Sequence, residues 1–185
     1  MNKMTSIRFH GRGGQGTVTA AELLAKAAFH EGKHSQAFPS FGVERRGAPV
    51  EAFCRVSDEK IRLREQIYFP DYLIIQDPTL IGADSPVLNG IKNCKGILIN
   101  SEKSAFAKAT ADASRNKNVV AVHATKIALE KIGKPFINTA LLGAFASMSK
   151  IVSLEALEKA IKEMFKPELA GPNIEAMKEA YKSIN

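Results

Sequence analysis

The stretch RFHGRGGQGTVTAAELLAKA, residues 8–27, joins a short apolar segment to an alanine- and leucine-rich one through a glycine-rich turn. The turn matches the G-x-G-x-x-G pattern of dinucleotide-binding loops with the run Gly11-Arg12-Gly13-Gly14-Gln15-Gly16. Residues 6–10 are typical of a strand, and the segment after the turn has apolar residues at helical spacing. Thr17 is the expected N-cap of that helix, and Gly32 its expected stop. The stretch therefore predicts a strand–loop–helix unit of an α/β fold.

The rest of the chain alternates between strand-like and helix-like segments. Residues 34–38 are a candidate second strand that Pro39 ends, and residues 49–64 predict a hairpin around a turn at 57–60. Runs rich in branched residues, typical of a buried parallel sheet, lie at 72–76, 96–100 and 119–123. Helical patterns follow at 124–133, 138–150, 153–165 and 172–184. We expect one α/β domain over residues 1–185, with a mostly parallel Rossmann-like sheet, a β-hairpin insertion and a helical C-terminal part.

Composition excludes several classes of protein. At 185 residues and 45% hydrophobic, the chain is long enough to bury one core. It has no apolar run of the length that a membrane span needs, and its first residues lack the apolar region of a secretory signal. Cys54 and Cys94 form no C-x-x-C pattern, and the histidines have no paired metal-binding spacing. We therefore expect a cytoplasmic protein with reduced thiols and no metal ligands.

The net charge of +7 reflects an excess of arginine and lysine, and these two residue types are distributed differently along the chain. Seven of the eight arginines lie in the first part of the chain: Arg8, Arg12, Arg45, Arg46, Arg55, Arg62 and Arg64. The lysines are spread among acids through the remainder, as on a solvated surface. The planar guanidinium suits bidentate contacts, so the arginine group is predicted to mark a binding site or a docking face. No basic helix or RNA-binding motif is present, and no nucleic-acid partner is expected.

Three interpretations of the glycine loop, residues 11–16, remain open. Glycines allow positive φ, and the start of the following helix offers free N–H groups to which Arg12 would add charge, so a phosphate-bearing ligand or a partner's backbone fits. A tight turn without any ligand fits as well. A nicotinamide or flavin site is the third interpretation, and it would make the chain an oxidoreductase in its own right.

The nicotinamide interpretation lacks its second element. A dinucleotide site carries an acidic residue about twenty positions beyond the loop, for the ribose hydroxyls. Here no acid stands between Glu31 and Glu44. Arg45 and Arg46 are the candidates for contacting a 2′-phosphate, but they lie beyond a proline-containing loop. Asp77 follows a buried strand but precedes a proline, so a turn or helix-capping role is expected for it. The sequence contains no recognised catalytic motif, and no catalytic residue is predicted.

Four segments together resemble the gamma subunit of the 2-oxoacid:ferredoxin oxidoreductases. They are IRFHGRGGQG (7–16), SQAFPSFGVERRGAPVEAF (35–53), PDYLIIQD (70–77) and NTALLGAF (138–145). The resemblance runs from about Ile7 to Tyr181, and the long central block makes it more specific than the glycine loop alone. It implies a complex that converts a 2-oxoacid and coenzyme A to an acyl-CoA and carbon dioxide while reducing ferredoxin.

The resemblance also assigns cofactors and partners. It implies thiamine diphosphate with Mg on the alpha and beta subunits and [4Fe–4S] clusters on the beta and delta subunits, and no cofactor on the gamma subunit. Partners are then the alpha, beta and delta subunits, with ferredoxin reached through the complex. By the same resemblance, the loop from Gly11 to Gly16 (Gly11, Arg12, Gly13, Gly14, Gln15 and Gly16), together with Arg45 and Arg46, lies near the coenzyme A site.

Within this family, the block FGVERRGAP (41–49) resembles the pyruvate and branched-chain members. Members that act on 2-oxoglutarate have a G-P-E-x-R-G-G pattern here, whereas in this chain Ala48 and Pro49 follow Gly47. Pyruvate is the expected substrate of the complex. A branched-chain 2-oxoacid, or a subunit shared between the two complexes, is the alternative, and a free-standing NAD(P)-binding oxidoreductase is a further one.

Overall fold

The sheet of the protein is mostly parallel. The computed structural model describes residues 4–40, 46–82, 86–102 and 118–184. Six strands pair in the order β2-β3-β1-β4-β5-β6, namely β1 (Thr5–Arg12), β2 (His34–Pro39), β3 (Pro49–Ser57), β4 (Tyr72–Ile75), β5 (Gly96–Asn100) and β6 (Val119–Val122). β1, β4, β5 and β6 are mutually parallel, whereas β3 is antiparallel to both β1 and β2. The predicted α/β fold class is confirmed.

The hairpin lies at a different place from the one predicted. β2 and β3 form the antiparallel pair, whereas residues 61–64, where a second strand was expected after the 57–60 turn, contain no strand. The reason is that β3 has no free edge. Thr5 of β1 pairs with Val56 on one side, and His34 of β2 pairs with Ser57 on the other. A strand folding back from Ser57 would therefore find no free edge on β3 with which to form a hairpin.

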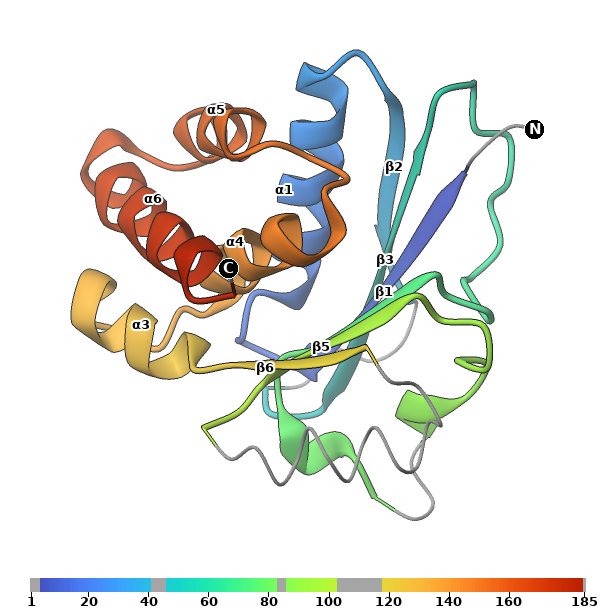
Figure 1. The fold of residues 1–185 in the computed structure, drawn as a ribbon, viewed down its shortest axis with the longest axis horizontal. Coiled ribbons are helices and arrows are strands. Elements are labelled where there is room, and N and C mark those ends of the chain that lie inside the picture. Colours follow the sequence, from blue (N-terminus) through green and yellow to red (C-terminus); the bar gives the residue numbers. More distant parts are fainter. Residues whose placement is uncertain (1–3, 41–45, 83–85, 103–117, 185) are drawn as a thin grey trace.

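All described α-helices cover one face of the sheet (Figure 1). They are α1 (Thr17–His30), α3 (Ala124–Ile132), α4 (Asn138–Ser149), α5 (Leu154–Met164) and α6 (Pro167–Lys182). α6 begins before the predicted start at Pro172, which lies inside the helix, because Lys166 already accepts hydrogen bonds from Leu169 and Ala170. Gly143 lets α4 approach α6 closely, since a side chain there would overlap the Met177 carbonyl. No described helix is long and apolar enough to cross a membrane.

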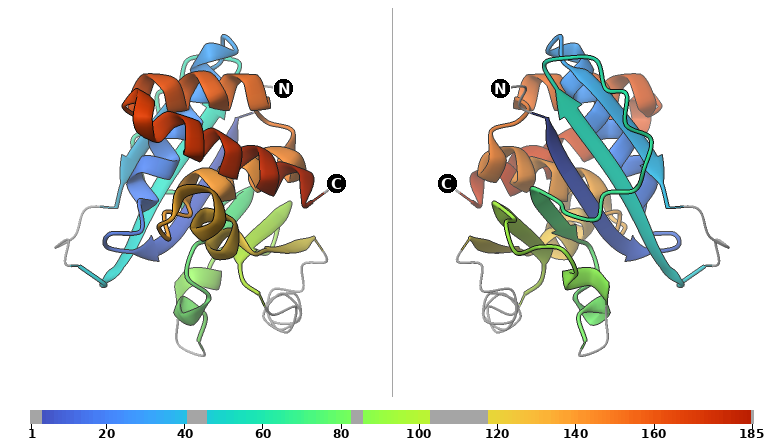
Figure 2. Two further views of the ribbon diagram at one scale, coloured as in Figure 1. Left: turned by 90° about the vertical axis from the view of Figure 1, so that its left-hand side faces the viewer. Right: turned by 90° about the vertical axis from the view of Figure 1, so that its right-hand side faces the viewer.

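The opposite face of the sheet is covered by irregular chain (Figure 2). Residues 58–71 cross it, and two short 3₁₀ turns, η1 (Pro78–Leu80) and η2 (Pro86–Leu88), lie beyond them. A small apolar cluster packs beneath: Leu73, Ile75, Val87, Ile91, Cys94, Ile97 and Ile99. The main core lies on the helical face and includes Ile7, Phe9, Leu24, Leu98 and Phe145. Because strand residues alternate, β1 sends Ile7 and Phe9 into the main core and Arg8 and His10 toward the irregular face.

Arg8 and Arg55 do not belong to a binding site, contrary to the prediction for the arginine group. They are only 5% and 2% exposed. Arg8 donates to the carbonyls of Val87 at 2.9 Å and Asn89 at 2.7 Å, and Arg55 donates to that of Glu65 at 2.7 Å. Buried guanidinium groups need such acceptors because desolvation without them is costly. These two arginines therefore fix the irregular chain onto the sheet.

His10 is buried beside this arginine layer. Its Nδ1 lies 3.4 Å from Glu51 Oε1, across the β1–β3 pair, and the residue is 3% exposed. Burial, and then the positive charge of Arg8, lowers the pKa of His10 to about 3. The folded protein therefore holds a neutral imidazole here at physiological pH.

The stability of the protein is expected to fall in mild acid because of His10. In the unfolded chain His10 has a pKa of about 6.5 and is protonated in mild acid. In the folded chain it stays neutral until the pH falls to about 3. Unfolding free energy should drop by up to about 2 kcal/mol between pH 7 and pH 5. Urea denaturation at both pH values measures it. His10→Gln should flatten this slope while His34→Gln, at an exposed position, should not; equal slopes for all three proteins would contradict the assignment.

Candidate functional site

The glycine loop lies at the topological switch point of the sheet. β1 and β4 are parallel neighbours, and the chain continues from β1 toward β2 and β3 but from β4 toward β5 and β6. Ligands of open α/β sheets bind at the carboxyl ends of such strands. The loop follows β1, Gln76 and Asp77 follow β4, and Asn100 ends β5. The fold thus brings the predicted loop to the place where a ligand site is expected.

The glycines of the loop serve different purposes. Gly14 and Gly16 have positive φ, 96° and 71°, which glycine adopts without strain. Gly11 belongs to β1, and a side chain on it would overlap the side-chain oxygens of Gln76 and Thr17. Its absent side chain therefore makes room for other residues of the protein. In the G-x-G-x-x-G pattern, only the residues after Gly11 are therefore available to approach a ligand.

Thr17 is not the N-cap of α1, contrary to the prediction. Gly16 occupies that position in the left-handed conformation, so Thr17 falls in the first helical turn, where its side chain faces the sheet. Its buried hydroxyl donates to Gln76 Oε1 at 2.5 Å. Sequence reasoning did not identify Gln76. The available signal was a polar residue at the end of the buried run YLIIQ.

Arg12 fastens the loop to three neighbours. Its Nε lies 2.7 Å from Asp77 Oδ2, and its two terminal nitrogens donate to the Gly47 carbonyl at 3.1 Å and to Thr79 Oγ1 at 2.9 Å. Asp77 also caps η1 by accepting from the Thr79 N–H at 2.9 Å, which confirms its predicted capping role. Burial would raise the pKa of Asp77, but hydrogen bonds from Thr79 and Arg12 outweigh it and lower the pKa. Asp77 is therefore a carboxylate that holds Arg12 in place.

A second backbone segment closes one side of the loop. Gly13 N donates to Ala48 O at 2.9 Å, and Gly47 N donates to Gly13 O at 3.1 Å. The neighbouring Arg46 is exposed, and its backbone pairs with that of Gly13 in an isolated parallel β-bridge. The structure thus brings this predicted site residue beside the loop. Arg45 lies outside the described residues.

The pairing of residues 46–48 with Gly13 is inconsistent with a dinucleotide site. In a Rossmann site the strand beside β1 on this side is parallel, and its carboxyl end carries the ribose-binding acid. Here that neighbour is the antiparallel β3, whose first residues pair with Gly11 and Arg12. Among the described residues, no parallel strand ends beside the loop to present a ribose-binding acid at that position.

A hollow of about 330 Å³ lies at the start of α1. Its lining includes Arg12, Gly13, Gly14, Gly16, Thr17, Thr19 and Val50. The first N–H groups of an α-helix have no partners within the helix and carry partial positive charge, which favours an anion. The first turn of α1 contains no acidic residue that would oppose one. The hollow is chemically suited to a phosphate group.

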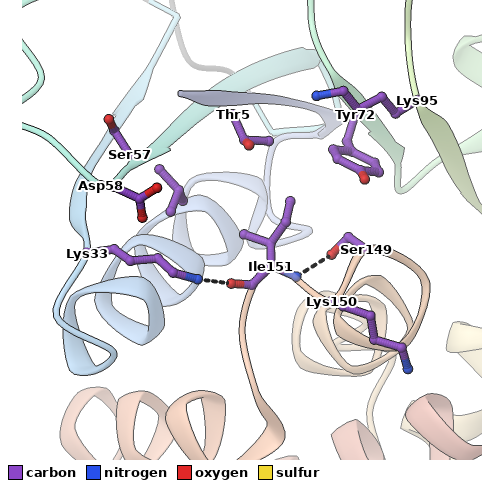
Figure 3. Close-up of a pocket in the computed structure, with 10 residues that line it drawn as sticks. Thr5, Lys33, Ser57, Asp58, Tyr72, Lys95, Ser149, Lys150 and Ile151 are labelled. Carbon is purple, nitrogen blue, oxygen red and sulfur yellow. Dashed lines mark hydrogen bonds between the residues drawn. The ribbon is translucent and has the colours of Figure 1, made fainter. Parts of the chain in front are cut away.

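A different hollow, of about 250 Å³, lies at the opposite end of the strands, where β1 and β4 begin (Figure 3). Its lysines have partners within the chain. Lys33 donates to the Ile151 carbonyl at 2.5 Å, Lys95 lies 2.6 Å from Asp71, and Lys150 points away from the hollow, 3.3 Å from the Tyr181 hydroxyl. These contacts join the sheet to the helical C-terminal part. This hollow is therefore a structural junction.

Neither cysteine has the surroundings of a reactive thiol. Cys54 and Cys94 are buried and form no disulfide bond, and burial raises the pKa of each thiol. A raised pKa keeps the thiol protonated, whereas nucleophiles and metal ligands are thiolates. Within the described ranges, no three His, Cys, Asp or Glu side chains are grouped so that they could hold a metal ion.

Gly11→Ala should destabilise the protein far more than Gly14→Ala. The new methyl group at residue 11 would overlap the bonded pair Gln76 and Thr17, a packing conflict that costs about 2–3 kcal/mol. At residue 14 nothing lies within 4 Å, and only the positive φ opposes the change, by about 1 kcal/mol. Urea denaturation of both variants tests this. Equal losses of unfolding free energy would show that Gly11 is not a packing position.

Comparison with known proteins identifies the family. The sequence model of the pyruvate ferredoxin/flavodoxin oxidoreductase family matches residues 6–183. The chain is 50% identical over 181 residues to "Pyruvate synthase subunit PorC" of Methanothermobacter marburgensis, covering 98% of each chain. It is 49% identical over 178 residues to "Pyruvate/ketoisovalerate oxidoreductases common subunit gamma" of Pyrococcus furiosus, covering 96% of each.

A solved structure agrees with this result. Subunit PORC of the Thermotoga maritima pyruvate oxidoreductase has 36% sequence identity and a TM-score of 0.83, over 97% of this chain and 96% of that one. Fold and sequence thus lead to one assignment. The chain belongs to the pyruvate ferredoxin/flavodoxin oxidoreductase family, as a gamma-type subunit of a 2-oxoacid:ferredoxin oxidoreductase.

Proposed function

We propose that the chain is the gamma subunit of a cytoplasmic pyruvate:ferredoxin oxidoreductase, which converts pyruvate and coenzyme A to acetyl-CoA and carbon dioxide and reduces ferredoxin. Relatives about half identical to it over nearly their whole length carry the name pyruvate synthase. Others, equally similar, are named as a subunit common to pyruvate and ketoisovalerate enzymes. A branched-chain 2-oxoacid complex, or a subunit shared with one, is therefore the second candidate.

The chemistry of the reaction belongs to other subunits in this proposal. Thiamine diphosphate with Mg is assigned to the alpha and beta subunits, and the [4Fe–4S] clusters to the beta and delta subunits. The observation that supports this division is that the polar side chains at the loop bind other residues of the chain. Thr17 binds Gln76, and Arg12 binds Asp77, so these side chains are held by the fold and are not poised to move protons.

The loop and Arg46 are proposed to face a phosphate group of coenzyme A. The first N–H groups of α1 supply donors to the hollow, and the exposed Arg46 lies beside them. Arg12 lines the same hollow but donates to Asp77, Gly47 and Thr79, so its role is to hold the loop in shape. Arg46 is thus the side chain free to add charge, with Arg45 before it in the sequence.

Arg46→Ala should raise the apparent KM for coenzyme A about five- to tenfold and leave kcat unchanged. An exposed guanidinium–phosphate contact contributes about 1 kcal/mol, and it acts on binding rather than on the chemical step. Steady-state ferredoxin reduction by the assembled complex measures both constants. Lys159→Ala, an exposed cation on α5, is the matched control.

Two further results obtained with the complex would be decisive. A complex that keeps full pyruvate- and coenzyme A-dependent ferredoxin reduction without this chain would refute the proposed function. If Arg46→Ala instead prevents assembly, and any complex that forms has an unchanged KM for coenzyme A, the loop docks on a partner subunit and does not bind the ligand.

The isolated chain should not bind NADH or NADPH. The loop has no ribose-binding acid, and the antiparallel β3 occupies the side where such a residue would stand. Isothermal titration calorimetry with millimolar cofactor should give no binding heat. Saturable binding at micromolar cofactor, abolished by Gly14→Val, would restore the free-standing oxidoreductase as a candidate.

A further inference from the structure

The irregular segment Lys60–Phe69, here called the crossing segment, contains no helix or strand. It passes over the face of the sheet opposite the helices (Figure 2). It belongs to the connection 58–71 between β3 and β4, and connections of this length without secondary structure are uncommon in compact domains and are usually either functional or disordered. None of its residues lines the hollow at the start of α1, so the proposed coenzyme A site does not use it.

Two buried arginines fix the backbone of the crossing segment from below. Arg55 donates to the Glu65 carbonyl at 2.7 Å, and Arg8 donates to the Tyr68 carbonyl at 3.3 Å. Gly90 leaves room for that same carbonyl, because a side chain at residue 90 would overlap it. Burying two guanidinium groups is a costly way to fill space beneath a loop, since apolar side chains would do so without desolvating a charge. The arrangement defines the conformation of the segment.

The outward side chains of the segment are aromatic and basic. Phe69 is 81% exposed and Tyr68 61% exposed. Lys60, Arg62 and Arg64 are exposed as well. Glu65 is the only acid among residues 60–69, and its charge acts on the buried Arg55. A rigid segment thus presents two large apolar side chains together with three cations.

A hollow of about 260 Å³ separates the crossing segment from β2, the edge strand of the sheet. It is lined by His34, Gln36, Lys60, Leu63 and Arg64, among others. Two of these are cations, so the hollow favours an acidic side chain. Tyrosine, arginine and other large side chains dominate the energetics of protein interfaces, and fixed segments bind with a lower ordering cost.

We propose that the crossing segment is a preformed docking surface for an acidic face of another subunit of the complex, with Tyr68 and Phe69 as its anchors. The inference rests on the proposed function, in which the chain works inside a complex. The charge of the segment favours an acidic subunit over a second copy of this chain as the partner. A second copy presenting the same face would place Arg62 and Arg64 against cations of its own kind, whereas an acidic partner complements them.

The test uses the co-expressed complex with an affinity tag on another subunit. Tyr68→Ala/Phe69→Ala should reduce retention of this chain at least tenfold, measured as its dissociation rate from the immobilised complex. Phe29→Ala removes an aromatic side chain of similar exposure, 69%, from the helical face and should leave retention unchanged. Thermal unfolding of the isolated variants checks that both fold.

Charge reversal tests the acidic partner independently. Arg62→Glu/Arg64→Glu should speed dissociation at least tenfold at low salt and reduce its salt dependence, because the reversed charges repel the partner. Lys131→Glu/Lys159→Glu, on α3 and α5, reverses the same number of exposed charges elsewhere and should have little effect.

Several outcomes would overturn the inference. Wild-type retention of both double variants, or an equal loss in the Phe29→Ala control, would show that the surface is not an interface. Dimers of the isolated chain that Tyr68→Ala/Phe69→Ala disrupts would assign the surface to a second copy. A wild-type chain that never joins the complex would refute the proposed function and this inference with it, whereas normal assembly of the variants would refute the inference alone.

Discussion

The arrangement of the whole molecule depends on how β1 pairs. One edge of β1 hydrogen-bonds to the antiparallel β3, and the other to the parallel β4. The parallel edge creates the switch point at which the glycine loop lies. The antiparallel edge brings residues 46–48 against Gly13, because β3 begins where β1 ends. A dinucleotide-binding sheet has a parallel strand at that position, so one reversed neighbour separates a G-x-G-x-x-G sequence from the function it usually indicates.

Local pattern was sufficient for most of the fold. Alternation and branched residues located the parallel strands, and helical spacing located the C-terminal helices. The failed hairpin at 57–60 shows the limit, because strand propensity in residues 61–64 is satisfied only if a partner edge exists, and both edges of β3 are taken. Thr17 shows the same limit on a smaller scale. Its sequence position suits a cap, but the left-handed Gly16 takes that role and turns Thr17 toward Gln76.

The candidate site was predictable in its position but not in its bonding. The glycine run and the arginines predicted a ligand site at the loop, and this loop lies at the switch point of the sheet. Sequence alone could not distinguish an arginine that faces a ligand from one that holds the fold. Arg8 and Arg55 lie within strands, and their partners are carbonyl groups of distant residues, which leave no trace in side-chain identity. Arg12 is likewise fastened by Asp77, a contact between residues 65 positions apart.

One face of β1 connects the loop to the crossing segment. Arg8, His10 and Arg12 alternate along the strand with core residues, so all three point toward the irregular side. Arg8 holds the crossing segment, and Arg12 holds the glycine loop. His10 stands between them, and a protonated imidazole there would put three cations in a row on one buried strand face. Burial and the charge of Arg8 lower the pKa of His10 and keep the imidazole neutral, so no third cation is added to this strand face. The two proposed surfaces of the subunit are therefore both held in place by residues on one face of a single strand.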